Sequence, residues 1–200
     1  MSQPETAPLR AEEMDLAPWR AFLHAHARVA RRLDEDLRIR HALSLQEYET
    51  LLHLAEAPGR RLRMGRLADS LLLSKSGVTR LVDRLVDDGL VERTSCSSDA
   101  RGAEAALTGS GLARLRAAAP THLAGIRDHF FGAVLPADLP AVERAMAAIA
   151  DQLCSGTACL HAVVTDGADA CEHDDTGPAD AVAADAVAAD AALGRVAARA

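Results

Sequence analysis

Aromatic side chains are scarce in this chain of 200 residues, which has three Phe, one Tyr and one Trp. A hydrophobic core must therefore be built mainly from Leu, Ala and Val, and this composition favours helices over strands. A chain of this length folds as one domain or two small ones and can bury a substantial core. We expect a mainly helical protein.

Long apolar runs are also absent. Because no run of 18 apolar residues occurs, the sequence predicts no transmembrane helix and no membrane partner. The first residues, MSQPETAPLRAEEMD, lack the charged-then-apolar order of a signal peptide, so we expect a cytoplasmic protein with reduced cysteines. Neither a phosphate-binding glycine loop nor a GxSxG motif occurs, and the histidines are scattered. We therefore expect no enzyme and no bound cofactor.

The net charge of -7 argues at first against a nucleic-acid partner, but the acidic residues are unevenly distributed. Residues 154–200 contain 2 Arg and 8 acids, whereas residues 1–153 contain 20 Lys and Arg against 21 Asp and Glu. Between Arg60 and Arg101 there are 9 basic and 6 acidic residues. A local excess of this sign suits contacts with phosphates, so the composition leaves DNA binding open.

Residues 67–89 predict two helices joined by a short apolar turn. Ser74 is a good N-cap for the second helix, and Gly89 can end it in a left-handed conformation. One face of this helix is apolar: Val78, Leu81, Val82 and Leu85. The other is short, hydroxylated and cationic, which suits the major groove of double-stranded DNA. The predicted contact residues are Ser74, Lys75, Ser76, Thr79, Arg80 and Arg84, and the alternative is a merely exposed helix face.

For Arg84, and for three arginines earlier in the chain, the sequence allows an interpretation other than DNA contact. Arg84 could reach a phosphate, but an ion pair within its own helix is an equal alternative because three acids surround it: Asp83, Asp87 and Asp88. Arg60, Arg61 and Arg63 follow the helix-stopping Pro58-Gly59 pair. They form either a solvated turn or contacts with the DNA backbone.

The residues after Gly89, LVERTSCSSDARGAEAALT, read as a strand, a polar tip and a returning strand. Since Ala and Gly pack poorly on a pleated sheet, we expect the returning strand, residues 102–107, to be short or frayed. The helix ending in LVDDGLVER, the Asp99-Ala100-Arg101 triplet and the following Leu107-Thr108 resemble the winged helix-turn-helix signature of the MarR (multiple antibiotic resistance regulator) family. The resemblance covers about residues 15–153.

That resemblance implies a mainly α fold with a small β wing. The winged helix-turn-helix lobe would span residues 44–107, and dimerisation helices would span 15–41 and 108–153. It also implies that Arg101 enters the minor groove and that Asp99 holds it in place, and the less favoured alternative for Asp99 is a solvated loop acid.

Helix signals outside this lobe fit the same plan. Asp15 can cap the first helix, Ser44 and Glu47 form a capping box, and Thr108 can cap a helix in which Pro120 predicts a kink. The last helix starts at Pro136 or Asp138. Because the two C-terminal helices are one-faced and have no evident intrachain partner beyond each other, we predict a two-fold homodimer.

The two ends of the chain differ in composition from the domain between them. Residues 1–14 predict a flexible arm, and residues 154–200, with an Ala/Asp repeat, a disordered acidic tail. Cysteines and histidines of the tail resemble zinc ligands in type but not in spacing: Cys154, Cys159, His161, Cys171 and His173. We expect no metal site, while metal sensing by the tail or oxidation of Cys96 remains an alternative.

The resemblance further implies an effector pocket bordered by Trp19, His26, Tyr48 and Glu49, which in this family typically takes small aromatic or phenolic compounds. The alternative is that Trp19 and Tyr48 are ordinary core residues. Taken together, the sequence predicts a dimeric, ligand-responsive repressor that binds a pseudo-palindromic operator. Rival interpretations are a metal- or thiol-responsive regulator of the same fold and a winged-helix module that does not bind DNA.

Overall fold

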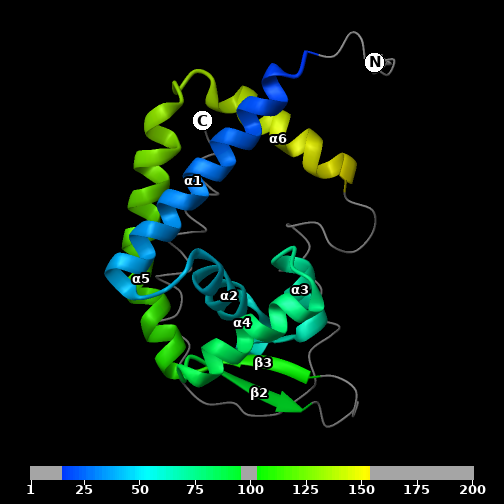
Figure 1. Ribbon diagram of the computed structural model, residues 1–200, viewed down its shortest axis with the longest axis vertical. Helices are drawn as coiled ribbons and strands as arrows, with labels where there is room; N and C mark the ends of the chain where they lie inside the picture. The colour runs from blue at the N-terminus through cyan, green and yellow to red at the C-terminus, as the bar shows by residue number, and fades with distance from the viewer. Residues whose placement is uncertain (1–14, 96–102, 154–200) are drawn as a thin grey trace.

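The computed structural model describes residues 15–95 and 103–153 and is mainly helical (Figure 1). The elements in chain order are α1 (Ala17–His41), α2 (Leu45–Glu56), η2 (Pro58–Arg60), β1 (Arg61–Arg63), α3 (Met64–Ser70), α4 (Lys75–Asp87), β2 (Val91–Ser95), β3 (Ala103–Leu107), α5 (Gly109–His129), η3 (Phe131–Ala133) and α6 (Leu139–Leu153). Figure 1 shows α1 and α5 side by side, with α2, α3, α4 and the strands forming a lobe at one end of this pair. The predicted arm (1–14) and acidic tail (154–200) lie outside the described residues.

The sheet has three antiparallel strands in the order β1-β3-β2. Arg61 pairs with Ala106, and Val91 pairs with Leu107. β1 was not predicted, because three residues after a turn are too few for an alternating pattern to indicate a strand.

The prediction for β3 was right in length and wrong in character. The strand has five residues, but it is the central strand of the sheet and is not frayed. Ala105 is fully buried and Ala106 is 5% exposed. Hydrogen bonding on both edges compensates for the poor strand preference of alanine, and its small side chain allows α2 to pack close to the sheet.

Helix starts follow the caps that the sequence predicts. In α2, the Ser44 hydroxyl accepts the Glu47 amide at 3.2 Å, and the Glu47 carboxylate accepts the Ser44 amide at 2.8 Å. The Thr108 hydroxyl caps α5 by accepting the Gly111 amide at 3.0 Å. Asp15 lies one residue before the cap position of α1, and its carboxylate accepts the Ala17 amide. Helix α5 continues through Pro120 as one element.

The long helix α5 has intrachain partners in α1 and α2. It packs along α1, where His41 Nε2 lies 2.8 Å from Thr121 Oγ1 and Arg114 donates to the His41 carbonyl at 2.8 Å. The helices approach closely at Gly125, where an added Cβ would lie 2.6 Å from the end of the Leu33 side chain, so that side chain would have to shift. In contrast, α6 has no buried residue in the described part of the chain.

One apolar core joins the lobe to the α1–α5 pair. Its fully buried members come from α1, the loop before α2, α2, α3, α4, β2, β3 and α5: Leu37, Leu43, Tyr48, Leu51, Leu54, Leu67, Val78, Val82, Leu85, Val91, Ala105 and Ala118. This core fixes α4 on the lobe through its apolar face. No helix within the described residues is long and apolar enough to cross a bilayer.

Candidate nucleic-acid interface

Helices α3 and α4 form the predicted helix-turn-helix. The turn between them places Leu72 in a left-handed conformation, with φ of 52°. Ser74 then caps α4, its hydroxyl accepting the Gly77 amide at 3.1 Å. All four residues of the predicted apolar stripe are buried: Val78, Leu81, Val82 and Leu85. The stripe therefore holds α4 on the lobe and turns its polar face outward.

The end of α4 follows from Gly89, whose φ is 70°. The Gly89 amide donates to the Val86 carbonyl at 2.9 Å, and the Leu90 amide donates to the Leu85 carbonyl at 2.8 Å. This pair of hydrogen bonds is the Schellman arrangement, which a residue without Cβ adopts at least cost. Leu90, the residue after this turn, is buried, and β2 begins directly after it at Val91.

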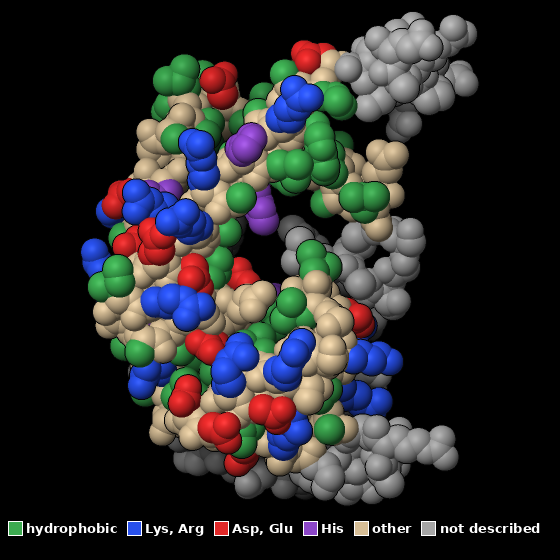
Figure 2. Space-filling view, viewed as in Figure 1, with side chains coloured by type: hydrophobic (Ala, Val, Ile, Leu, Met, Phe, Trp, Pro, Cys, Tyr) green, Lys and Arg blue, Asp and Glu red, His purple; other side chains and the backbone are tan. Residues whose placement is uncertain are grey.

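The outer face of α4 is open to solvent. Lys75, Ser76, Thr79 and Arg80 are all exposed. The Thr79 hydroxyl donates to the Lys75 carbonyl at 2.8 Å, and the Ser76 hydroxyl lies 3.2 Å from the Ser74 hydroxyl. Among the described residues, neither Lys75 nor Arg80 forms an ion pair. Both cations are thus available to a ligand outside the protein. Figure 2 shows Lys and Arg side chains on this lobe, with acidic side chains among them.

Arg84 does not form the ion pair within its own helix that was one of its two interpretations. Its Nε lies 3.3 Å from Oε1 of Glu47, so it pairs with an acid of α2 and not with one in its own helix. The Glu47 side chain is only 14% exposed. Burial alone would raise the pKa of Glu47, but hydrogen bonds from Ser44 and the guanidinium of Arg84 lower it overall. The ionised carboxylate is therefore well suited to hold Arg84.

Arg93 of β2 is a residue that the sequence analysis missed. Its guanidinium lies 2.8 Å from the Asp83 carboxylate and donates to the Thr79 carbonyl at 3.3 Å. It therefore ties the wing to α4. The sequence separation of ten residues and more gives no periodic signal for such a contact.

The arginines after Pro58-Gly59 enter the sheet edge. Arg61 and Arg63 belong to β1, and Arg60 has a left-handed backbone with φ of 55°. The Nε atom of Arg63 is buried without a hydrogen-bond partner in the described structure. Besides the solvated turn and the phosphate contact that the sequence left open, the structure therefore shows an edge strand, β1, that carries Arg61 and Arg63 next to the other strands of the wing.

Several predicted residues lie outside the described part of the chain. These are Asp99 and Arg101, Cys96, and the tail residues Cys154, Cys159, His161, Cys171 and His173. Within residues 15–95 and 103–153, no cluster of three or more His, Cys, Asp or Glu side chains could hold a metal ion.

The predicted effector-pocket residues are not all brought together. Tyr48 is 1% exposed and packs against His122, with ring centroids 4.3 Å apart, so it is a core residue. Trp19 is 56% exposed, so it does not belong to the core of this chain. Its ring centroid lies 5.9 Å from that of Phe22.

Glu49 is a pocket candidate whose pKa is perturbed by its surroundings. Burial raises the pKa of Glu49, while the nearby His26 acts in the opposite direction. One helical turn further along α2, burial lowers the pKa of His53. This side of α2 therefore disfavours charge on both groups.

Comparisons with known proteins agree with this geometry. A family model described as the MarR family matches residues 42–102. AbsC, a MarR family transcriptional regulator from Streptomyces coelicolor, is 36% identical, with a TM-score of 0.65 over 74% of this chain and 98% of AbsC. Sco3205, a MarR family regulator from the same organism whose structure is in complex with DNA, is 34% identical, with a TM-score of 0.67 over 79% of this chain and 98% of Sco3205.

A more distant structure shares the fold alone. The organohalide-sensing regulator RdhR-CbdbA1625 in its 2,4-dichlorophenol-bound form is 14% identical, with a TM-score of 0.62 over 76% of this chain and 90% of that protein. No curated protein sequence matches significantly. Because the chain shares about a third of its residues with two MarR family regulators and spans nearly all of each, it belongs to the MarR family of DNA-binding winged helix-turn-helix transcriptional regulators, which are not enzymes.

Proposed function

We propose that this regulator is a homodimeric repressor that binds a pseudo-palindromic operator and releases it when a small aromatic or phenolic compound binds. The observation that carries the proposal is the outward polar face of α4, on which Lys75 and Arg80 are exposed and have no ion-pair partner in the described structure. Ser76 and Thr79 add hydroxyls to this face. Such a face matches the edges of bases in the major groove and the phosphates beside them.

Exposed apolar side chains support the dimer. They occur on the N-terminal half of α1 and along α6: Trp19, Phe22, Leu23, Met146, Ile149 and Leu153. Figure 2 shows hydrophobic side chains gathered where α1 and α6 lie in Figure 1. A second copy would cover these residues and would present a second α4 about 34 Å from the first, one turn of DNA away.

The contact residues would divide into two classes. Arg80, Ser76 and Thr79 would face bases in the major groove, and Lys75 would lie near phosphates at the start of α4. The family resemblance assigns Arg101 to the minor groove and Asp99 to holding it there. Lys75→Ala should therefore weaken binding to all duplexes and lower the salt dependence, whereas Arg80→Ala should lose about 1–3 kcal/mol on the preferred site and relax specificity.

DNA selected from a random duplex pool tests the function. Wild-type protein should enrich a two-fold symmetric sequence, and the affinity measured by fluorescence anisotropy should fall steeply with salt. Placing the enriched site over a promoter in a reporter assay then separates repression from activation. Failure to enrich any sequence at low salt would favour an interaction module instead.

The effector proposal depends on the lobe's junction with the α1–α5 pair. Glu49 and His26 interact there, and both lie on segments that border the effector pocket in this family. The dichlorophenol-bound relative has the same fold, which supports a phenolic ligand class. A ligand that binds the free dimer better than the DNA-bound shape would shift the population away from DNA. A panel of phenols and aromatic carboxylates should contain compounds that raise the melting temperature and lower DNA affinity.

A further inference from the structure

Glu47 joins two helices, α2 and α4, through its two carboxylate oxygens. Oε2 accepts the Ser44 amide at 2.8 Å and thereby closes the capping box of α2. Oε1 accepts from Arg84 Nε of α4 at 3.3 Å. One half-buried carboxylate therefore holds both the start of α2 and the last turn of α4, the helix that carries the predicted DNA contacts.

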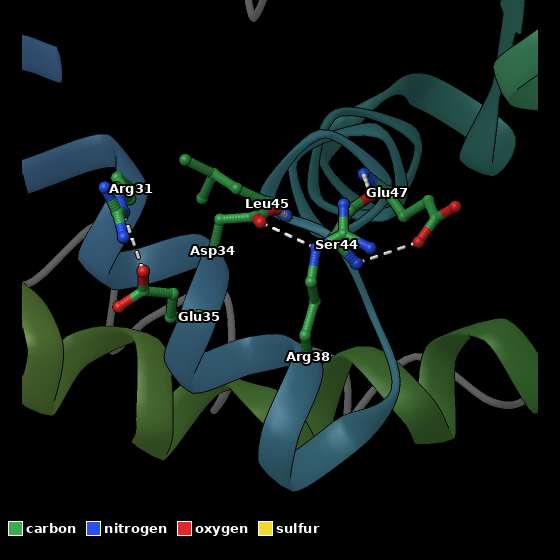
Figure 3. Close-up of polar contacts among 7 residues, drawn as sticks. All are labelled: Arg31, Asp34, Glu35, Arg38, Ser44, Leu45 and Glu47. Atoms are coloured by element: carbon green, nitrogen blue, oxygen red, sulfur yellow. Dashed lines mark hydrogen bonds and ion pairs between the residues drawn. The ribbon is translucent and has the colours of Figure 1, made fainter.

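The start of α2 is in turn fixed to α1. The Leu45 amide donates to Asp34 Oδ1 at 2.9 Å, and Arg38 Nε lies 2.6 Å from Asp34 Oδ2. Partial burial opposes ionisation of Asp34, but the hydrogen bonds from Arg38 and Leu45 lower its pKa overall. Figure 3 shows the Arg38 side chain between Asp34 and the first turn of α2. Glu47 also attracts the Arg38 guanidinium.

These contacts make a continuous polar connection from α1 to α4. It consists of the Asp34–Arg38 ion pair, the hydrogen bond from the Leu45 amide to Asp34, the capping box of α2 and the Glu47–Arg84 ion pair. Arg84 is 56% exposed but Glu47 is 14% exposed, so the pair is shielded more than a typical surface ion pair. The connection adds directional contacts to the non-directional packing of the apolar core, because a hydrogen bond depends on the angle between donor and acceptor.

We infer that Glu47 is a positioning residue that acts through Arg84 to set the orientation of α4 relative to α1, and so the spacing at which two copies meet DNA. The inference rests on the proposed dimer and its operator. It removes Arg84 from the DNA contacts, because its guanidinium serves a contact within the protein.

Two variants separate this role from a phosphate contact. Glu47→Gln keeps the capping box, since glutamine also serves at that position, but removes the charge that holds Arg84. Arg84→Gln removes the other partner from an exposed position. Glu35→Gln is the matched control, because it breaks the Arg31–Glu35 ion pair of 2.7 Å on α1 and does not involve α2.

The readout is discrimination between two duplexes. One is the duplex selected by the wild-type protein, and the other has one base pair inserted at its centre, which moves one half-site by about 3.4 Å and rotates it by roughly 35°. Glu47→Gln and Arg84→Gln should each lower the ratio of affinities for the two duplexes by about fivefold or more, with unchanged salt dependence. The double variant should be no worse than either single variant, and Glu35→Gln should retain the wild-type ratio.

Other results overturn the inference. If Arg84 contacts phosphate, Arg84→Gln would weaken both duplexes equally and lower the salt slope by about 0.9, and Glu47→Gln would bind as tightly as the wild type or more tightly. Unchanged ratios in both variants would also refute it. Should Glu47→Gln fail to fold, the exposed Arg84→Gln variant decides the question. A wild-type protein that selects no duplex refutes the proposed function itself, and the inference with it.

Discussion

Gly111 marks the tightest contact between α5 and the rest of the lobe. A Cβ at this position would collide with the Leu90 carbonyl oxygen and lie 2.8 Å from the Leu107 side chain. The carbonyl cannot easily move, because it accepts both the amide and the hydroxyl of Thr108, at 3.1 and 3.0 Å. A glycine here is required by packing and not by backbone conformation.

Gly111→Ala should therefore lower the free energy of unfolding by about 2–3 kcal/mol, as overpacking of a rigid site does. This corresponds to roughly 5–10 °C in melting temperature, measured by circular dichroism or calorimetry. Gly109→Ala is the control, because nothing lies within 4 Å of its Cβ and alanine favours helix. Equal melting temperatures for the two variants would contradict the packing argument.

Glu49 should give stability a pH dependence of defined sign. Burial raises its pKa above the ordinary value of 4.5, so the folded protein keeps this proton to higher pH than the unfolded chain does. The stabilising contribution is complete below pH 4.5 and is lost as pH rises through the raised pKa.

The side chain of Glu49→Gln stays neutral throughout. The melting temperature of this variant should therefore rise relative to that of the wild type, by about 1–3 °C, as pH rises from 4 to 7. Glu92→Gln, at an exposed carboxylate of β2, is the matched control. A constant difference between Glu49→Gln and the wild type across this range would show that the carboxyl is not desolvated.

The residues that sequence could predict are those whose roles are local. The helix caps act on neighbours a few residues away, so their roles can be predicted from the spacing of residue types. They are Ser74, Gly89 and the Ser44–Glu47 capping box. The partner of Arg84 is 37 residues distant along the chain. Nothing in periodicity distinguishes that partner from the adjacent acids, and only the packing of α2 against α4 selects Glu47.

At the scale of the element, α4 combines a structural cap with a surface suited to phosphates. Ser74 is exposed, and its hydroxyl is engaged by the Gly77 amide at 3.1 Å. The two roles of the helix start can be separated because aspartate also caps helices but carries a negative charge.

Ser74→Ala should lower the free energy of unfolding by about 1 kcal/mol, because the amide loses its partner. Ser74→Asp should keep the wild-type melting temperature yet weaken DNA binding at low salt, by roughly tenfold, through repulsion of phosphate. Thermal melts and anisotropy titrations on the same preparations test both. Full DNA affinity in Ser74→Asp would place the start of α4 away from the phosphates.

The sequence predicted the hairpin of the wing but not β1 or the central place of β3 in the sheet. Helices α2 and α4 follow from caps and apolar periodicity, whereas β1 has only three residues and β3 contains three alanines. Strand pairing stabilises them: β3 is hydrogen-bonded on both edges. Such stabilisation depends on segments about 40 residues apart, which local propensity does not reflect.

In the molecule as a whole, α6 is a helix whose apolar residues remain exposed to solvent, with none of its residues buried in the described structure. Met146, Ile149 and Leu153 are 39%, 49% and 76% exposed and share one stripe of the helix. Scattered exposed apolar residues are ordinary, but a stripe along one helix face is typical of an interface. If two copies meet there, the stripe controls both assembly and the phase of the two α4 helices.

Ile149→Glu should therefore convert the proposed dimer to a monomer. Burying a carboxylate in an apolar interface costs several kcal/mol, which is comparable to the whole free energy of association of a moderately stable dimer. Ala148→Glu introduces the same charge on the other side of α6 and should remain dimeric. Sedimentation equilibrium measures the oligomeric state, and circular dichroism checks that helix content is kept. The monomer should bind the selected duplex at least about a hundredfold more weakly, because binding of the second half-site is no longer intramolecular. A dimeric Ile149→Glu protein with unchanged DNA affinity would place the dimer interface, or the stoichiometry on DNA, elsewhere.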